Sequence, residues 1–501
     1  MVLDELGEPI IGANIVEKGT TNGTITDMDG NYSLTVNDLK KAVLQASFIG
    51  YNTIEESVKG RSTVEIKLSP SVVNLGEVVA IGYGTQTRKE ITGSVANITE
   101  KDFNQGVTRE ASDLLQGKVA GLNIASGSGD VSSSPQIRLR GTSTLQNDQG
   151  PMIVIDGIPG GDMSTVAPSD IESISVLKDA SSAAIYGSRS AGGVILITTK
   201  RGSGSKTQVN YDGYVALSSL ANKPDLLTAD KWRSYAASVG QSEQAKQFDQ
   251  YGASTDWFDE ISRTGFSQNH SLSLSGGSSK SNYRASVNYL KNSGVIRDNE
   301  MERFNFRFQF QQRAINDRLR IGLTGAATIL DYNPTYGYNF VLAYNMLPVF
   351  PVKMSDGSWY ENVGYDLGNP VHNIEANTRE NKTNSYYGVG DLQFTIIDGL
   401  DIKASLYKSR RLNEYSQYYD STTDAGRDDG GYAYKRSQTY DKDMMEWTLN
   451  YDKTFNDVHK VNGLLGYSWE ENMFSEFTAA NRNFTTDMLG ANKLQAGQDL
   501  R

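Results

Sequence analysis

The 501-residue sequence contains no cysteine and only three histidines, His270, His372 and His459. The lack of cysteine excludes disulfide frameworks, thiol nucleophiles and thiolate metal sites, and it modestly favours a cell-envelope location. The histidines are scattered and form no HExxH pattern, and neither a GxSxG elbow nor a phosphate-binding glycine loop occurs. We therefore expect no enzyme, no metal site and no cofactor.

Long apolar runs are also missing. The longest candidates, 152–155 and 194–197, fall far short of the roughly 18 to 20 residues that a membrane-spanning helix needs. The start, Met1 to Glu5, has acids where a signal peptide has basic and apolar regions, so we expect either no export or a missing true beginning. The formal net charge of −11 gives nucleic acid no reason to bind.

Aromatic residues are scarce in the first part of the chain. Residues 1–200 contain four Tyr, two Phe and no Trp, whereas residues 201–501 contain 23 Tyr, 14 Phe and all five Trp. Because the composition changes near 202–205, we place a domain boundary there.

Residues 1–69 consist of short β-prone runs between turn residues, which predicts a small β-sandwich. The segment 27–31 superficially resembles a calcium loop, but its glycine comes too early and no glutamate closes it, so we expect a plain turn with Asp29-Gly30 in a hairpin. The expected strands are 9–16, 24–27, 32–36, 42–48 and 63–68.

Residues 70–90 carry Pro70 and several glycines around one β-prone tetrad, 78–81, for which no partner strand is evident nearby. This pattern indicates a tether with an embedded strand. Residues 91–203 mix both periodicities, which predicts an α+β domain. Its expected elements are helices at 111–119 and 180–186, the second capped by Asp179, and strands at 136–140, 152–155, 173–177 and 194–198.

Residues 204–501 alternate apolar and polar side chains, most clearly over 304–310, where four phenylalanines share one face. A period of two predicts β-strands. We expect Phe304, Phe306, Phe308 and Phe310 to face lipid. The nine strands, expected to pair antiparallel in sequence order, are 207–218, 267–276, 281–291, 302–313, 318–330, 385–397, 400–411, 441–454 and 459–470.

The connections between these strands alternate between short and long. Soluble sandwiches also show polar and apolar alternation, but the aromatic excess and the alternating connections favour an outer-membrane β-barrel with short periplasmic turns and long external loops. The short connections are near 277–280, 314–317, 398–399 and 455–458, and the long ones near 219–266, 292–301, 331–384 and 412–440.

Three segments match one family in order and spacing. Residues 7–14, 18–20 and 26–32 resemble the carboxypeptidase-regulatory-like β-domain, and 75–86 resemble a Ton box followed by Gly-Tyr-Gly. The third segment runs from 137 to 202 through Ile137-Arg138-Leu139-Arg140-Gly141, Ile153-Val154-Ile155-Asp156-Gly157 and Ile185-Tyr186-Gly187-Ser188-Arg189, and it is similar to the plug of SusC/RagA-type TonB-dependent outer-membrane transporters.

The resemblance implies a mainly β chain with a carboxypeptidase-regulatory-like sandwich at 1–69, a linker with a Ton box at 70–90, a plug at 91–203 and part of a transmembrane barrel at 204–501. It implies that Arg138, Arg140 and Arg189 form ion pairs with the barrel wall, while the glycines serve turn geometry. The implied Ton box is Glu77, Val78, Val79, Ala80, Ile81, Gly82 and Tyr83, and the implied plug motif is Arg138, Arg140, Gly141, Asp156, Gly157, Asp179, Tyr186, Gly187, Arg189 and Gly193.

The sequence departs from the family pattern in two ways. Gly76 stands where an Asp is common, and Ala80-Ile81 replace the usual valines, which does not block pairing through backbone groups. Nine strands are fewer than the roughly 22 with which such plugged transporters close, so we expect an N-terminal piece with the signal peptide and the last part of the barrel missing.

By resemblance, the intact protein imports a bulky nutrient across the outer membrane, most often a glycan oligomer and sometimes a peptide. The implied partners are TonB with its ExbB/ExbD energy coupling, a SusD-like surface lipoprotein and outer-membrane lipid. Two alternatives are a non-transporting sensor of the same fold and a secreted β-rich adhesin or glycan-binding module, which would lack a Ton box. The sequence does not identify the substrate or the loop residues that bind it.

Overall fold

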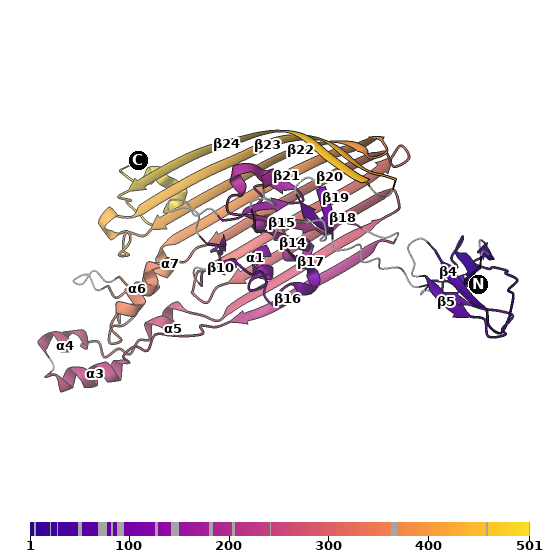
Figure 1. Ribbon diagram of the computed structural model, residues 1–501. Helices are drawn as coiled ribbons and strands as arrows, with labels where there is room; N and C mark the ends of the chain where they lie inside the picture. Colours follow the sequence, from indigo (N-terminus) through magenta and orange to yellow (C-terminus); the bar gives the residue numbers. More distant parts are fainter. Residues whose placement is uncertain are drawn as a thin grey trace. The chain divides into compact units, whose positions relative to one another are not determined.

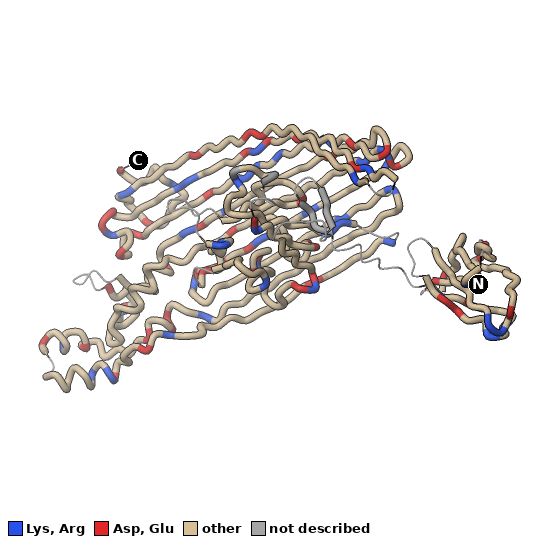
Figure 2. Tube along the Cα trace, viewed as in Figure 1, with Lys and Arg blue, Asp and Glu red and all other residues tan. Residues whose placement is uncertain are grey.

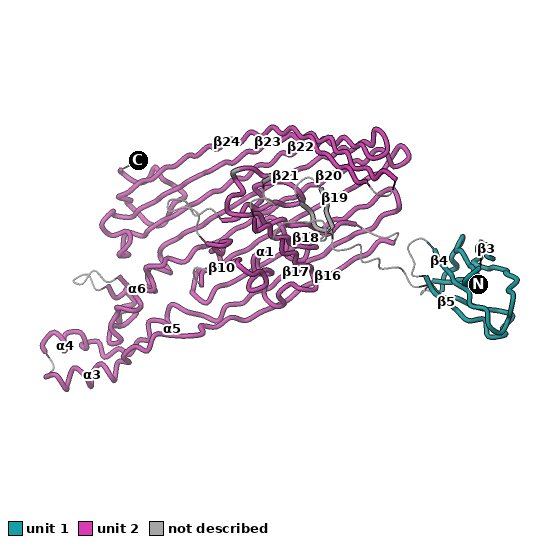
Figure 3. The backbone as a smooth tube through the Cα atoms, viewed as in Figure 1, with its two compact units in different colours: residues 1–92 teal, residues 93–501 magenta. Residues whose placement is uncertain are grey.

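The computed structural model divides into two compact units, residues 1–92 and 93–501, each described by itself (Figure 3). It describes residues 1–499 except 5–6, 21, 28, 49–52, 69–77, 82–83, 88–94, 126–128, 142–149, 180–183, 203–205, 241, 362–367 and 457–458.

The first unit opens with a small β-sandwich, as predicted. A four-stranded sheet in the order β3-β2-β4-β5 and a parallel pair, β1-β6, enclose one apolar core that includes Ile15, Leu44 and Ile66. The strands are β1 (Val2–Leu3), β2 (Asn14–Glu17), β3 (Gly23–Ile25), β4 (Val43–Ser47), β5 (Ile54–Ser57) and β6 (Ile66–Lys67).

Two details of this domain differ from the prediction. Residues 32–36 are not a strand, although Tyr32, Leu34 and Val36 still pack against the core; their alternation reflects one buried side of an extended loop. The sheet instead gains β5, which the charged pair Glu55-Glu56 hid from pattern reading. The Asp27 carboxylate accepts the backbone N–H groups of residues 29 and 31 at 3.0 and 2.8 Å, so it closes a turn.

The predicted lone strand of the linker has a partner. β7 (Val78–Ile81) pairs antiparallel with β8 (Gly84–Thr87), which corrects the expectation that no strand lies nearby. The partner was missed because Gly84-Thr85-Gln86-Thr87 has little apolar content, whereas hairpin pairing uses backbone groups.

The second unit begins with an α+β domain, residues 93–201, which we call the inner domain. Its sheet runs β13-β12-β15-β14-β9, and the buried strand β15 reads as an unbroken apolar run because both of its faces are covered. Residues 180–183 of the predicted second helix lie outside the described residues, and 184–190 form a 3₁₀ turn. The elements are β9 (Val95–Thr99), η1 (Glu100–Asp102), α1 (Ala111–Leu115), β10 (Leu122–Ala125), β11 (Gln136–Leu139), β12 (Met152–Ile155), β13 (Ile158–Pro159), η2 (Met163–Thr165), η3 (Pro168–Asp170), β14 (Ile171–Leu177), η4 (Ala184–Ser190) and β15 (Val194–Thr199).

The rest of the second unit is one sheet of nine strands, which we call the wall (Figure 1). All neighbours pair antiparallel in sequence order, which confirms the predicted topology. The strands are β16 (Gln208–Ser218), β17 (Gly265–Gly277), β18 (Ser281–Ser293), β19 (Glu300–Ala314), β20 (Leu319–Asn333), β21 (Thr378–Ile397), β22 (Leu400–Tyr419), β23 (Tyr432–Phe455) and β24 (His459–Arg482).

The last four strands are longer than predicted, because β21 to β24 have 20 to 24 residues each. The connection between β22 and β23 is correspondingly shorter than expected, with 420–431 left between them, and the one between β18 and β19 is also short, at 294–299. The missed ends of β21 to β24 are polar on both faces, so the alternation on which the prediction relied fades there. No helix among the described residues is long and apolar enough to cross a bilayer.

One face of the wall carries a continuous apolar band. Phe304, Phe306 and Phe308 are 39–42% exposed, and their cross-strand neighbours include Val287 and Ile329. The seven residues 304–310 of β19 span about 20 Å, close to the roughly 25 Å height of a lipid-facing band in an outer-membrane barrel. Charged pairs such as Lys408 and Asp443 end the band on the side of the long connections. Lys, Arg, Asp and Glu are interleaved along the wall (Figure 2).

The long connections fold into short helices with a core of their own. Trp257, Phe258 and Val371 lie in it, and the Trp257 indole donates to the Leu347 carbonyl at 3.0 Å, which joins the connection before β17 to the one before β21. The helices are α3 (Ala229–Ser238), α4 (Glu243–Phe248), α5 (Trp257–Ile261), α6 (Tyr338–Asn345) and α7 (Pro370–Ala376); beyond them, η6 (Arg427–Asp429) and η7 (Gly490–Ala496) lie near the ends of β22 to β24.

The band allows a direct test, because a chain without cysteine accepts single-site labels. A nitroxide at Phe306→Cys should be reached more readily by oxygen than by a water-soluble nickel complex, since we expect this site to lie in lipid. A label at Lys382→Cys, on the same face beyond the band, should show the opposite preference. Electron paramagnetic resonance of both labelled variants in membranes measures the accessibility of each label to oxygen and to nickel. Greater accessibility of the Phe306→Cys label to nickel than to oxygen would contradict the assignment.

Candidate functional site

The inner face of the wall is polar and contacts the inner domain through buried charges. Asp170, only 4% exposed at the end of η3, accepts Arg284 Nη2 at 2.8 Å and Ser286 Oγ at 2.5 Å. Both partners lie on β18, on the face opposite the apolar band. The carboxylate thus neutralises a wall guanidinium that is itself almost fully buried.

A second carboxylate of the inner domain, Asp156, follows β12 directly. Its Oδ1 accepts the Thr199 backbone N–H at 2.9 Å and its Oδ2 the Thr199 hydroxyl at 2.8 Å, so its position is fixed from within the domain. It also forms a buried ion pair with Arg307 of β19, whose guanidinium donates to the Tyr387 hydroxyl as well. Asp156 therefore links the inner domain to two wall strands.

Backbone groups of the inner domain complete the contact along β19. Arg303, 2% exposed, donates to the Arg109 carbonyl, and Asn305 Nδ2 donates to the Ser164 carbonyl at 3.0 Å. Nearby, burial raises the pKa of the Glu110 carboxyl, which accepts the Ser112 hydroxyl at 2.7 Å. The side-chain donors on this part of β19 are thus hydrogen-bonded mainly by groups of the inner domain.

Further along the wall the contacts become more exposed. Arg189 of η4 pairs with Glu470 of β24 at 2.9 Å, and Arg411 of β22 pairs with Asp162 at 3.0 Å. Lys442 Nζ donates to the Pro159 carbonyl at 2.8 Å. Exposed pairs contribute little stability, commonly below about 1 kcal/mol, so these contacts orient the domain rather than hold it.

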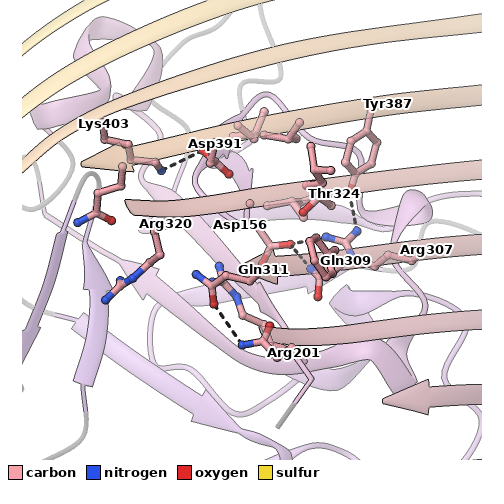
Figure 4. Close-up of a pocket in the computed structure, with 18 residues that line it drawn as sticks. Asp156, Arg201, Arg307, Gln309, Gln311, Arg320, Thr324, Tyr387, Asp391 and Lys403 are labelled. Carbon is pink, nitrogen blue, oxygen red and sulfur yellow. Dashed lines mark hydrogen bonds and ion pairs between the residues drawn. The ribbon is translucent and has the colours of Figure 1, made fainter. Parts of the chain in front are cut away.

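A cavity lies where Asp156 meets the wall (Figure 4). The inner domain contributes Ile155, Asp156, Ile158 and Arg201. The wall contributes a mixed-charge lining that includes the Lys403–Asp391 pair at 3.2 Å. In the part of the chain that the structure describes, no group of three or more His, Asp or Glu could hold a metal ion. The arrangement offers recognition of polar groups and no nucleophile poised by a base.

Comparisons with known proteins identify family models and relatives that match this chain. A model described as the TonB-dependent Receptor Plug Domain matches residues 87–194, and one described as a CarboxypepD_reg-like domain matches residues 1–80. TonB-dependent receptor P3 of Formosa agariphila is 33% identical over 505 residues, which cover 98% of this chain and 50% of that protein. TonB-dependent receptor SusC of Bacteroides thetaiotaomicron is 35% identical over 441 residues, 81% of this chain and 43% of that protein.

The chain belongs to the SusC/RagA type of TonB-dependent receptors.

Solved structures show the same fold. The RagAB peptide importer in its open-open state superposes with a TM-score of 0.71 at 24% identity, over 84% of this chain and 52% of that one. FpvA of P. aeruginosa superposes with a TM-score of 0.51 at 12% identity, over 85% and 48%. The chain spans about half the length of the relatives it matches. Receptors of this family are transporters and not enzymes.

The inner domain is thus the plug, and several residues of its expected motif have a defined place. Asp156 and Arg189 bond the wall as described, which confirms the expected ion pair for Arg189. Gly193 has φ of +88°, and a Cβ there would come within 2.3 Å of the Leu139 side chain, so this turn before β15 requires glycine. Gly141, Gly157 and Gly187 also have positive φ, at +107°, +90° and +67°, as turn glycines do.

The other motif residues make local contacts or lie apart from the wall contacts described. Arg138 is exposed on β11 and bonds Gln136 at 3.3 Å, and Arg140 is exposed with φ of +59° and donates its backbone N–H to the Gly121 carbonyl. The ion pairs with the wall that the resemblance implies for Arg138 and Arg140 stay predictions. Asp179 lies two residues after the end of the plug strand β14, and Tyr186 is half-buried in η4. Of the Ton box, 78–81 form β7, while Glu77, Gly82 and Tyr83 lie outside the described residues.

Sequence reasoning missed Asp170, the most buried carboxylate of the interface. It stands in Pro168-Ser169-Asp170, which reads as an ordinary turn. Its partner Arg284 was hidden within an alternating strand, where a charged residue on the inner face looks solvated. Only the packing of the plug against β18 reveals the pair.

The buried and exposed pairs should respond differently to mutation. Asp170→Ala leaves Arg284 buried without a countercharge, so we expect a loss of about 3–5 kcal/mol in the stability of the docked plug. Arg189→Ala removes an exposed pair and should cost below about 1 kcal/mol. The measurement is the urea dependence of plug unfolding in detergent micelles, followed by limited proteolysis.

The apolar double variant Asp170→Leu/Arg284→Met is the matched control, because it removes both charges and should recover most of the loss. Equal losses for Asp170→Ala and Arg189→Ala would contradict the distinction between the two pairs.

Proposed function

We propose that this chain works in the TonB-dependent import of a bulky nutrient across the outer membrane, with a glycan oligomer as the favoured cargo and a peptide as the alternative. The observation that carries this proposal is a folded plug held against the polar face of a barrel wall whose other face is apolar. A wide barrel would leak unless its lumen were filled, so import needs a plug that can be displaced by work.

The division of the chain supports a route for that work. We assign 1–69 to the leading sandwich, 70–90 to the linker with the Ton box, 91–203 to the plug and 204–501 to the barrel. In this assignment the leading domain and the Ton box are periplasmic, and the short turns of the wall face the same side. TonB adds a strand to the Ton box, and ExbB/ExbD drive the pull on the plug.

The long connections form the opposite, external side in this proposal. Their helices share a core, so they present a folded surface on which a SusD-like lipoprotein can hold substrate over the lumen. A SusC protein is a relative of this chain, and a peptide importer shares its fold; together they support import while leaving glycan and peptide as the two cargo classes.

The Ton box offers the decisive test. Strand addition depends on backbone hydrogen bonds, so Val79→Ala should be mild, while proline removes a backbone donor that a paired strand needs. Successive N–H groups of a strand point to opposite sides, so Val79→Pro and Ala80→Pro test both registers. We expect one of them to abolish energy-dependent uptake by the transporter in cells.

Surface abundance, measured by quantitative blotting, must match the unmodified protein in all three variants. Normal uptake in both proline variants would remove the Ton-box assignment and the import proposal with it.

A further inference from the structure

Beyond the plug contacts, the inner face of β21 to β23 carries a second group of polar and aromatic side chains. Arg411, which bonds the plug, lies four residues before Tyr415 on β22, so this group begins about 14 Å further along the strand, toward the long connections. We call it the arginine–tyrosine cluster; its members are Arg379, Asn381, Tyr415, Tyr419, Tyr434 and Arg436.

Strand register brings the cluster together. Tyr415 pairs across the sheet with Asn381 on one side and Arg436 on the other, which places all three in one row. The Arg379 guanidinium lies 5.0 Å from the ring centre of Tyr419, and that of Arg436 lies 5.7 Å from the ring centre of Tyr415. Each guanidinium is thus positioned by an aromatic ring.

The two arginines differ from three other cations on the inner face of the last strands. Arg411, Lys442 and Arg482 pair with Asp162, Glu470 and Asp429 at 3.0, 3.4 and 2.8 Å. Arg379 and Arg436, by contrast, have no carboxylate within 4.0 Å among the residues that the structure describes. The cluster therefore carries two guanidiniums on a half-buried surface that have no ion pair among the described residues; Arg379 donates to the Tyr419 hydroxyl and lies 4.0 Å from the ring centre of Tyr336.

Two buried polar atoms of the cluster also lack a partner among the described residues. They are Nε of Arg436 and Oδ1 of Asn381, whose side chain belongs to a residue only 8% exposed. Unpaired buried donors and acceptors cost free energy, so a ligand with complementary groups can gain affinity there. Plug-facing residues such as Arg303 and Asn305 carry unpaired atoms too, so these atoms support the site only together with the two arginines. A donor and an acceptor flank Tyr415, one on each neighbouring strand.

We propose that the arginine–tyrosine cluster binds an acidic sugar unit of an oligosaccharide. The guanidiniums of Arg379 and Arg436 hold its carboxylate or sulfate ester through charge-assisted hydrogen bonds. The tyrosine rings cover the apolar C–H faces of the sugar, and Asn381 accepts a hydroxyl. This inference rests on the import function proposed above and narrows its cargo to anionic glycans.

The wall favours a sugar over a peptide at this place. From Asn381 on β21 to Arg436 on β23 the backbones are paired on both sides, and only residues 378–380 lack a partner on the β20 side, so little open strand edge is available to the main chain of a peptide. Recognition falls to side chains, and the rings of Tyr415 and Tyr434 lie 5.9 Å apart, as a short aromatic platform.

The test is binding to the purified protein in detergent, which needs no TonB. The probes are trigalacturonate, its methyl ester, a sulfated carrageenan oligosaccharide and triglutamate. Arg379→Gln/Arg436→Gln should raise the Kd for an acidic oligosaccharide at least ten-fold, while the methyl ester binds weakly to both proteins. Arg379→Lys/Arg436→Lys, which keeps the charge but loses the bidentate geometry, should cause an intermediate rise.

Arg410→Gln is the matched control, since Arg410 lies on β22, the strand between those of the two arginines, but on the opposite face, paired with Asp441. It should leave the Kd unchanged, and all variants should melt at the same temperature. A preference for trigalacturonate or for the carrageenan probe identifies the anion as carboxylate or sulfate. Whichever of Val79→Pro and Ala80→Pro abolishes uptake should leave binding intact, so failure of import and failure of this site are distinguishable.

Three results would overturn the inference: no binding of either acidic oligosaccharide to the unmodified protein, a Kd that the double Gln variant does not change, or cluster-dependent binding of triglutamate alone. The last would assign the cluster to acidic peptides.

Discussion

The two-residue period of the wall is the constraint on which the rest of this structure depends. A strand paired on both sides must place alternate side chains on opposite faces, so an apolar outer band at Phe304, Phe306 and Phe308 forces Arg303, Asn305 and Arg307 inward. Those inward groups are nearly fully buried and need partners. The plug supplies them, chiefly through Asp156 and backbone carbonyls, so the sequence of the wall presupposes a folded domain inside it.

This interface has the polarity that reversible displacement requires. Groups such as Asp170 and Arg284 are stable while paired, and both regain full hydration if the plug leaves them together. An apolar interface would instead expose its whole area to water, at roughly 25 cal/mol for each Å². Removing only one partner is the costly event, because it strands a buried charge. Mutation of a single residue therefore destabilises the interface more than concerted movement of the whole plug does.

Much of the fold could be predicted because strand polarity is written residue by residue, and all nine wall strands pair in the predicted order. The prediction failed where local pattern carries no information. Residues 32–36 alternate yet form a loop, and Gly84–Thr87 pair with the Ton-box strand despite their polar content. In the site, the resemblance found Asp156 and Arg189, whereas Asp170 gave no signal, because burial is decided by distant segments that meet only in the folded chain.

The same limit explains why charge must be read after folding. Along the inner face of β22 and β23, Arg411 and Lys442 are matched by an acid from the plug and one from a neighbouring strand. Further along β21 and β23, beyond those contacts, the guanidiniums of Arg379 and Arg436 lie over tyrosine rings and have no ion pair among the described residues. The sequence places all four in polar runs of similar composition. Only register shows which cations pair with acids of the plug or of a neighbouring strand and which do not, so the boundary between the plug contacts and the proposed ligand site lies along single strands.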